Sequence, residues 1–418
     1  MSIRPSTGAP EFDFDDLLSD VAVNQPSRFY GALREHCPMY FNRRWNGWIV
    51  TRYDDVTAGF RAHEQLSSDR MAGPWGEDYA LQDPSLHQYV YAVLSQSFVW
   101  RDPPFQTRVR TLLNKAFIPR RIERLRPRAR RLVADLVEAL PVDEPVDFLG
   151  GFAFHLPVMV ICEYLGIPAE ARESVKQWSD QLSGVVFVHG HDPDRESKAE
   201  EGARSLFEYV RSVVRERRDR PQDDLISAIL AAQDDTDDSF TEDEIVANIV
   251  LLVFAGHETT MNLISNGVAA FWRNPDQWRR LQARPELVRH AVEEILRVDG
   301  PLRATARWAR QPLVPGGAEI KLNDRVLLVQ IAADHDPAAF EDPDHFDIGR
   351  TGNRHVAFGA GIHTCLGAPL ARMESQEAFS YLSERFDVIE VVEDPPVYRP
   401  AIASGGFEKL HVVFRERR

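Results

Sequence analysis

The stretch that decides the fold reads Phe358-Gly359-Ala360-Gly361-Ile362-His363-Thr364-Cys365-Leu366-Gly367, and a helical run over 368–386 follows it. Three glycines within these ten residues let a backbone lie flat against a bulky group. Cys365 stands at the start of the predicted helix, with Pro369 in its first turn, so the helix N-terminus favours the thiolate over the thiol. Such a thiolate serves as a nucleophile, a redox thiol or a metal ligand.

A buried structural cysteine is the ordinary alternative, but it does not explain the glycines around Cys365. Zinc is poorly supported, because only His363 and Cys365 lie together and two ligands do not make a closed site. The other two cysteines, Cys37 and Cys162, are distant in sequence and form no CxxC. The sequence therefore predicts neither a zinc ribbon nor a disulfide framework.

The longest predicted helix lies between Thr241 and Asn274. Thr241 and Glu244 form a capping box at its start, and Pro275 cannot continue it. About 33 residues at 1.5 Å each give a length of roughly 50 Å. Because residues 249–255 are apolar on every face, we expect the central core helix of the molecule rather than a membrane span.

This helix is interrupted by Ala255-Gly256-His257-Glu258-Thr259-Thr260. A carboxylate beside a hydroxyl and close to a glycine is unfavourable in a buried helix, which suggests a chemical use for Glu258 and Thr259. In the structural alternative, Thr259 bonds back to the carbonyl of Ala255 and Glu258 finds a salt bridge. We expect His257 to be a satisfied neighbour rather than a ligand.

The composition bounds the class of protein. The 418 residues are 44% hydrophobic and 27% charged, which allows a large core and excludes disordered or fibrous chains. The 49 Lys+Arg against 64 Asp+Glu give a net charge of −15, which argues against a nucleic-acid binder. The first twenty residues hold no apolar signal region, so we expect a cytoplasmic protein without membrane attachment.

The periodicity predicts a mainly α chain with small β-sheets, arranged as one domain over 1–418. Helical spacing is clearest over 122–140, 155–165, 201–216 and 286–298. Strand signals are confined to 40–53, 319–331 and 386–414. Within the first of these, Asn46-Gly47 suits the tight turn of a hairpin.

The ten residues FGAGIHTCLG resemble the FGxGxHxCxG haem-binding loop of the cytochrome P-450 monooxygenases, a pattern with six specified positions. Ala255 to Thr260 is similar to the AGxETT segment of the oxygen-binding helix, and Glu294 with Arg297 is similar to the ExxR motif. The resemblance extends over essentially the whole chain. It implies the cytochrome P-450 fold, a triangular helix-rich domain with haem b between the long central helix and the Cys-loop helix.

The resemblance also implies roles for individual residues. Cys365 would be the proximal thiolate on the haem iron. The positions of the haem propionate ligands match His363, Arg110 and Arg307. Glu258 and Thr259, with Ala255 and Gly256 beside them, match the segment that delivers protons to dioxygen, and Glu294 and Arg297 would form a structural ion pair. Further haem contacts are expected from Gln106, Phe358, Gly359 and Gly367.

Three positions depart from the family pattern. Gln106 replaces a histidine that often binds a propionate, so haem is expected to have one charged contact fewer. His345 stands where many relatives have the arginine that completes the ExxR cluster, which is expected to weaken that contact. Asp334-His335 replaces the usual Asn-Arg. None of these changes removes the thiolate or the Glu258/Thr259 pair.

The chain contains no flavin or iron–sulfur motif, so a separate electron donor is implied, a ferredoxin or flavodoxin with its NAD(P)H reductase. Between Arg108 and Arg131, ten basic residues stand against the single acidic Glu123. An ordinary solvated helix face explains this run. The alternative is a landing site for an acidic electron donor on the thiolate side of the fold.

The substrate is expected to be a small hydrophobic or aromatic molecule. The expected pocket residues are Leu94, Phe98, Leu251, Phe254 and Arg303, the last of these as a possible partner of a substrate carboxylate. The segments 71–100 and 185–191 are expected to roof the pocket.

As to activity, the resemblance implies a monomeric haem-thiolate monooxygenase that uses O2 and two electrons to oxidise, most simply to hydroxylate, its substrate. A specialised member that performs ring coupling, desaturation, nitration or peroxide-driven oxidation is the enzyme alternative. A haem-based sensor is the alternative from another class, although no effector segment is found.

Overall fold

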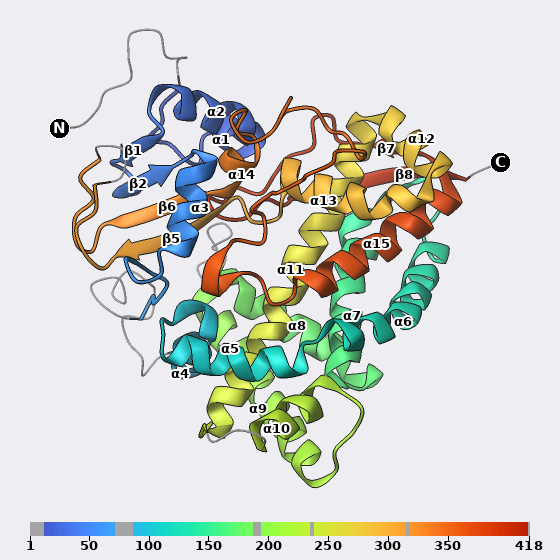
Figure 1. The fold of residues 1–418 in the computed structure, drawn as a ribbon. Coiled ribbons are helices and arrows are strands. Elements are labelled where there is room, and N and C mark those ends of the chain that lie inside the picture. Colours follow the sequence, from blue (N-terminus) through green and yellow to red (C-terminus); the bar gives the residue numbers. More distant parts are fainter. Residues whose placement is uncertain (1–11, 72–86, 187–193, 235–237, 315–317, 417–418) are drawn as a thin grey trace.

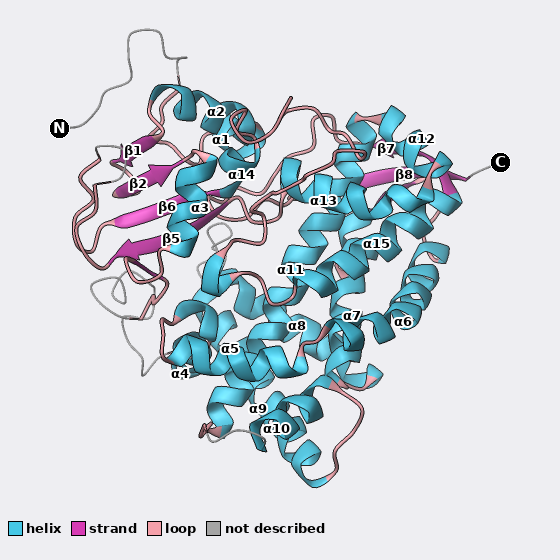
Figure 2. Cartoon of the chain, viewed as in Figure 1, coloured by secondary structure: helices cyan, strands magenta, loops and turns pink. Residues whose placement is uncertain are grey.

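The computed structural model describes residues 12–71, 87–186, 194–234, 238–314 and 318–416. Helices dominate a roughly triangular molecule, and the two small sheets lie toward two of its corners (Figures 1 and 2). The α-helices are α1 (Asp20–Asn24), α2 (Pro26–His36), α3 (Tyr53–Arg61), α4 (Gln88–Gln96), α5 (Phe105–Ala116), α6 (Pro119–Glu138), α7 (His155–Leu165), α8 (Arg172–Val186), α9 (Arg195–Asp219), α10 (Leu225–Asp234), α11 (Glu242–Arg273), α12 (Pro275–Ala283), α13 (Val288–Asp299), α14 (Gln330–Asp334) and α15 (Ala368–Arg385).

Short helical turns occur at Phe98–Trp100, Leu149–Ala153, Ala169–Ala171, Pro285–Leu287 and Gly361–His363. The strands are β1 (Met39–Asn42), β2 (Gly47–Val50), β3 (Leu66–Ser67), β4 (Pro145–Asp147), β5 (Ala304–Ala309), β6 (Arg325–Val329), β7 (Phe386–Val391) and β8 (His411–Glu416). They form a five-stranded sheet of order β1-β2-β6-β5-β3 and a three-stranded sheet of order β4-β8-β7. The predicted class, mainly α with small sheets, is confirmed.

The long helix α11 is the centre of the main core. Its capping box is present, since the Thr241 hydroxyl accepts the amide of Glu244 at 3.1 Å and the Glu244 carboxylate accepts the amide of Thr241 at 2.9 Å. By length and composition α11 could cross a membrane, but 78% of its most apolar window is buried inside the fold. It is a core helix, as the all-round apolar run predicts.

The predicted hairpin turn at Asn46-Gly47 is wrong by one position. Gly47 already belongs to β2 and pairs with Asn42, so the loop is formed by residues 43–46 and Asn46 takes the positive φ of 53°. A Cβ on Gly47 would lie 2.6 Å from Arg325 of the neighbouring strand β6. Glycine is therefore needed here for close strand packing rather than for the turn.

Candidate functional site: the Cys365 loop and the middle of α11

The Cys365 loop, residues 358–367, runs from the end of the five-stranded sheet region into α15. Gly359 and Gly361 both adopt positive φ, at 66° and 73°. A Cβ on Gly361 would lie 2.6 Å from the carbonyl oxygen of Phe60 in α3, and one on Gly367 would lie 3.9 Å from Cys365 Sγ. Glycine thus lets the loop lie against α3 on one side and keeps the sulfur uncovered on the other.

Cys365 lines a hollow inside the molecule. Its side chain has solvent-accessible surface, yet protein surrounds it. This burial raises the pKa of its thiol. The amides of Gly367 and Ala368 at the start of α15, together with the charges of Arg110 and Arg372, act in the opposite direction without overcoming burial. The start of α15 thus favours the thiolate, as expected, but in the protein alone burial outweighs this effect, whereas a bound metal cation would ionise the thiol outright.

Two side chains of α5 hold the loop on either side of His363. Arg110 Nη1 donates to the carbonyl oxygen of Thr364 at 2.6 Å, and Gln106 Nε2 donates to that of Ile362 at 2.8 Å. Gln106 is 1% exposed, so its amide is committed to the loop. One of the two Nε2 hydrogens is therefore used by the loop backbone, and the expected contact of Gln106 with haem stays a prediction.

Three basic side chains, those of Arg110, Arg307 and His363, gather here, and none of them forms a direct ion pair among the described residues. Among the described residues, neither Arg110 nor Arg307 forms an ion pair, and neither ring nitrogen of His363 has a hydrogen-bond partner. Burial, aided by Arg307 and Arg110, lowers the pKa of His363 to about 3, and burial lowers the pKa of Arg307 to about 10. Buried cations of this kind call for a negatively charged ligand.

The middle of α11 borders accessible space. Between Ile245 and Phe271 every residue is buried except Ala255, Gly256 and Thr259, which share one helix face. The hydrogen bond and the salt bridge expected if Thr259 and Glu258 were purely structural are both present. Thr259 Oγ1 donates to the carbonyl oxygen of Ala255 at 2.8 Å, and Glu258 Oε1 lies 3.6 Å from Arg399 Nη2. They hold the two side chains in place and leave the accessible face open.

His257 is a satisfied neighbour, as expected. It is 1% exposed, and its ring nitrogens lie 3.2 Å from Ser179 Oγ and 3.3 Å from Asp180 Oδ1 of α8.

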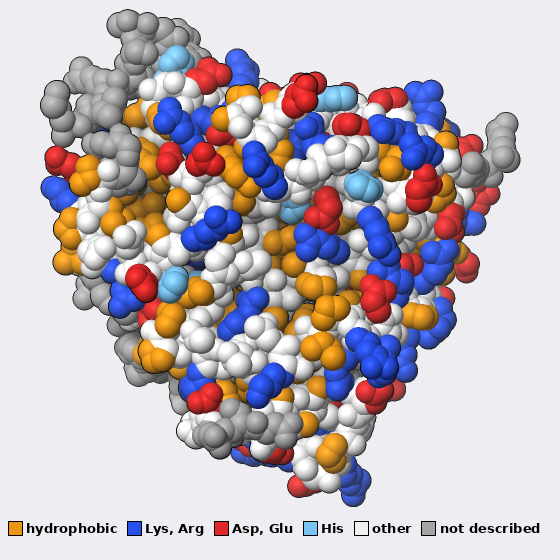
Figure 3. Space-filling model, in the orientation of Figure 1, with side chains coloured by type: hydrophobic (Ala, Val, Ile, Leu, Met, Phe, Trp, Pro, Cys, Tyr) orange, Lys and Arg blue, Asp and Glu red, His pale blue; other side chains and the backbone are white. Residues whose placement is uncertain are grey.

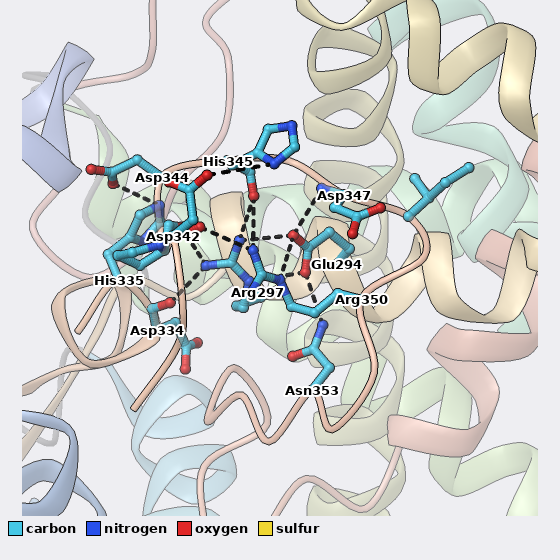
Figure 4. A network of polar contacts seen from close by, with 12 residues as sticks. Glu294, Arg297, Asp334, His335, Asp342, Asp344, His345, Asp347, Arg350 and Asn353 are labelled. Carbon is cyan, nitrogen blue, oxygen red and sulfur yellow. Dashed lines mark hydrogen bonds and ion pairs between the residues drawn. The ribbon is translucent and has the colours of Figure 1, made fainter. Parts of the chain in front are cut away.

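The ion pair of Glu294 and Arg297 is fully buried and is the centre of a larger network (Figure 4). Arg297 Nε and Nη2 donate to the two Glu294 oxygens at 2.9 and 2.8 Å, and Arg297 also donates to the backbone oxygens of Asp334, Pro343 and His345. Asn353 completes the other side of the carboxylate at 3.0 Å. The side chains of Glu294 and Arg297 are both 0% exposed, which agrees with a structural role.

The expectation that His345 weakens this network is wrong. Arg350, five residues further on, donates from Nε to Glu294 Oε1 at 3.1 Å. Figure 4 shows the His345 ring turned away from Arg297 and toward Asp342, from which its Nδ1 lies 3.7 Å, and only the backbone oxygen of His345 reaches Arg297. Sequence reasoning missed Arg350 because no regular spacing links it to helix α13.

The carboxylate next to Glu294 ties the same helix to the Cys365 loop. Glu293 accepts from Arg372 at 2.6 Å and from His355 at 3.0 Å. The Arg372 guanidinium in turn lies 4.5 Å from the ring centre of Phe358. Although burial acts to raise it, these hydrogen bonds lower the pKa of Glu293 to about 2.

The expected pocket residues are mostly core. Leu94, Phe98, Leu251 and Phe254 are at most 5% exposed, and Phe254 stacks on Trp100 with ring centres 6.0 Å apart. The expectation that Arg303 pairs with a substrate carboxylate is corrected. Its Nη1 donates to the carbonyl oxygen of Val23 at 2.7 Å and its guanidinium lies 4.3 Å above the Tyr398 ring, so its contacts are within the protein. Residues 72–86 and 187–193 of the expected roof lie outside the described residues.

The donor set fits haem. A thiol accessible within the interior suits an axial ligand of iron, and unpaired Arg110 and Arg307 suit the two carboxylates of the porphyrin. The loop glycines lack side chains, and Ala255, Gly256 and Thr259 form the accessible face of α11, which suits the two sides of a flat group. This combination defines the class of haem-thiolate proteins.

Comparisons with known proteins agree with this class. A family model described as Cytochrome P450 matches residues 176–405. Cytochrome P450 CYP107DY1 of Priestia megaterium is 36% identical over 96% of this chain and 98% of its own length, and vitamin D(3) 25-hydroxylase of Pseudonocardia autotrophica is 36% identical over 96% and 97%. The crystal structure of P450BioI with an acyl carrier protein that carries hexadec-9Z-enoic acid superposes with a TM-score of 0.85, at 31% identity and over 97% of this chain and all of that one.

The chain belongs to the cytochrome P450 family. It is a monooxygenase whose cofactor is haem with a cysteine thiolate ligand.

Proposed function

We propose that the chain acts as a single catalytic domain in which Cys365 ligates the haem iron and which oxidises a small hydrophobic or aromatic substrate. The observation that carries this proposal is the juxtaposition of the accessible Cys365 thiol with the unpaired Arg110 and Arg307. When bound, haem supplies the redox chemistry that splits dioxygen and inserts one oxygen atom into the substrate. The surrounding residues bind it, orient it and manage protons.

On this proposal Arg110, Arg307 and neutral His363 hold the propionates. Burial keeps His363 uncharged, so it acts as a hydrogen-bond donor while the two arginines supply positive charge. Gln106 fixes the loop backbone, and Arg372 stacks on Phe358 and adds positive charge near the sulfur. These contacts hold the sulfur still while the bond to iron is in place.

Glu258 and Thr259 handle protons on the accessible face of α11. Thr259 Oγ1 passes its hydroxyl proton toward dioxygen and regains a proton that comes from Glu258. The hydrogen bond from Thr259 to the Ala255 carbonyl oxygen fixes the rest position of the hydroxyl. Thr259→Ala should therefore raise peroxide release at the expense of product; unchanged coupling would remove Thr259 from the mechanism.

The electron donor is proposed to approach α5 and α6. Five of the ten basic side chains there form ion pairs within the protein, namely Arg108, Arg121, Arg126, Arg128 and Arg130. Basic and acidic side chains accordingly alternate over α6 and α15 (Figure 3). Exposed Lys115, Arg120, Arg124 and Arg131 form no ion pair among the described residues, and they favour an acidic ferredoxin or flavodoxin.

The names of relatives support a hydrophobic substrate without identifying it. One relative is a vitamin D(3) 25-hydroxylase and one similar structure binds a fatty acyl chain on its carrier protein. We propose further that the protein is cytoplasmic and monomeric.

The test is the absorption spectrum of the dithionite-reduced protein before and after carbon monoxide is added. A strongly red-shifted Soret band that is lost in Cys365→Ala is the expected result. A Soret band at the position of a histidine or neutral-thiol complex would contradict the assignment of Cys365, and absence of haem would remove the mechanism.

A further inference from the structure

Three buried polar residues lie one turn apart on one face of α11. Glu258, Asn262 and Asn266 are 4%, 1% and 0% exposed, and their spacing of four residues aligns them along the helix. Buried polar groups in an apolar helix need partners. All three find partners in the segment 392–410 between β7 and β8, which we call the C-terminal loop.

The contacts run along the whole line. Asn266 Nδ2 donates to the carbonyl oxygen of Gly405 at 3.0 Å, and Asn262 Oδ1 accepts from Arg399 Nη2 at 3.1 Å. The same Arg399 Nη2 lies 3.6 Å from Glu258 Oε1. A Cβ on Gly406 would lie 2.1 Å from Asn262 Oδ1, so the C-terminal loop packs on α11 as closely as glycine permits.

Arg399 joins the interior to the surface. Its side chain is 24% exposed, whereas that of Glu258 is 5% exposed. Its backbone amide donates to the Gly406 carbonyl oxygen at 2.8 Å, which fixes the base of the side chain. Arg399 Nε is buried and has no hydrogen-bond partner among the described residues, so the exposed quarter of the side chain, and not Nε, is what reaches solvent.

The charge balance explains why an arginine stands here. A carboxylate as buried as Glu258 stays ionised only beside a positive charge, and an arginine is always charged. The adjacent residue, Thr259, is on the accessible face of α11. Arg399 supplies such a positive charge 3.6 Å from Glu258, although it stands more than a hundred positions away in the sequence.

We propose that Arg399 is a positioning residue that holds Glu258 as a carboxylate beside Thr259 and links it to solvent water. This inference rests on the proton-handling role proposed for Glu258 and Thr259. In each turnover, a proton lost through Thr259 is replaced from solvent at Glu258. The carboxylate and the guanidinium are thus unchanged when the cycle ends.

The first test measures whether Glu258 is ionised in the haem-loaded protein at neutral pH, by infrared difference spectra against Glu258→Gln. The parent should show a carboxylate band that becomes a protonated carboxyl band in Arg399→Gln. Arg399→Lys, which keeps the charge, should retain the carboxylate with a shifted band. A carboxylate band unchanged in both variants would overturn the proposal.

Arg415→Gln is the matched control, because Arg415 is 48% exposed on β8 and pairs only with surface carboxylates, Glu390 and Asp143, among the described residues. It should leave the Glu258 band as it is in the parent. A loss of the band in this control as well would show a general effect of removing an arginine and would overturn the proposal.

The second test measures peroxide released per NADH with 7-ethoxycoumarin and surrogate redox proteins. Arg399→Gln should raise this ratio severalfold, Arg399→Lys less so, and the double variant Glu258→Gln/Arg399→Gln no more than Glu258→Gln alone. Additive effects in the double variant would contradict action through Glu258. Failure of the proposed function is separate, because it would appear as unchanged coupling in Thr259→Ala or as a lost thiolate spectrum in the parent.

Discussion

Two groups of buried arginines differ in whether the protein supplies their anions. In the first group, Arg297 and Arg350 donate hydrogen bonds to the carboxylate of Glu294 and to five backbone oxygens. This network is complete within the chain. Near the Cys365 loop, Arg110 and Arg307 donate hydrogen bonds only to backbone oxygens and to the side-chain oxygen of Asn114 among the described residues, and they lie over the rings of Phe98 and Phe60. The first group is satisfied by the fold, and the second is left for a ligand to satisfy.

The difference shows how one chain uses the same residue type for two purposes. Removing an arginine from the Glu294 network leaves a buried carboxylate without its partner. Such a change is expected to lower the stability of the fold. Removing a cation from the Cys365 group leaves no buried carboxylate of the protein without its partner, so it is expected mainly to damage cofactor retention. Four predictions follow this contrast, from the largest expected effect to the smallest.

Arg297→Met should reduce the free energy of unfolding by about 3–5 kcal/mol, because Glu294 would lose its main partner in a fully buried site. Urea unfolding of the purified protein measures the change. The double variant Glu294→Gln/Arg297→Met should be less destabilised than the sum of the single changes. Strict additivity would show that the pair does not act as a unit.

Acid should weaken the attachment of α13 to the Cys365 loop through Glu293. Its pKa is lowered from 4.5 to about 2, so the stabilisation is complete above pH 4.5 and is lost as the pH falls toward 2. The contribution is about 2–3 kcal/mol. Glu293→Gln should flatten the pH dependence of unfolding in this window, and an unchanged slope would show that other carboxylates dominate it.

Arg307→Met should speed haem loss to excess apomyoglobin about tenfold, through loss of one charge-assisted contact. Its free energy of unfolding in the haem-free state should be unchanged or slightly higher, since a buried charge without a carboxylate is removed. Strong destabilisation comparable to that of Arg297→Met would end the distinction between the two groups.

Arg350→Ala should cost about 1–2 kcal/mol of unfolding free energy, because one of the contacts to Glu294 is lost. His345→Ala should cost less than about 0.5 kcal/mol, because the ring is 56% exposed and only the backbone oxygen is used. Thermal unfolding of the two variants compares them directly, and a larger effect at His345 would reverse the assignment.

The sequence was most predictive where local rules operate. The bounds of α11, its capping box and the helical run after Cys365 follow from periodicity and capping chemistry, and the ion pair of Glu294 and Arg297 follows from its spacing on one helix. The loop motif led to the family. The contacts of Gln106, Arg350 and Arg399 could not be predicted, because each joins segments that only the tertiary fold brings together. Arg303 failed for the same reason, since its partner Val23 is 280 residues away.

The hydrogen bonds from α5 to the Cys365 loop affect which residues of that loop can be substituted. Gln106 and Arg110 hold carbonyl oxygens of Ile362 and Thr364, and a carbonyl is the same whatever side chain its residue carries. Both positions are among the unspecified ones of the FGxGxHxCxG pattern. New side chains there could thus be tried during evolution without losing the hydrogen bonds that hold the backbone around the sulfur.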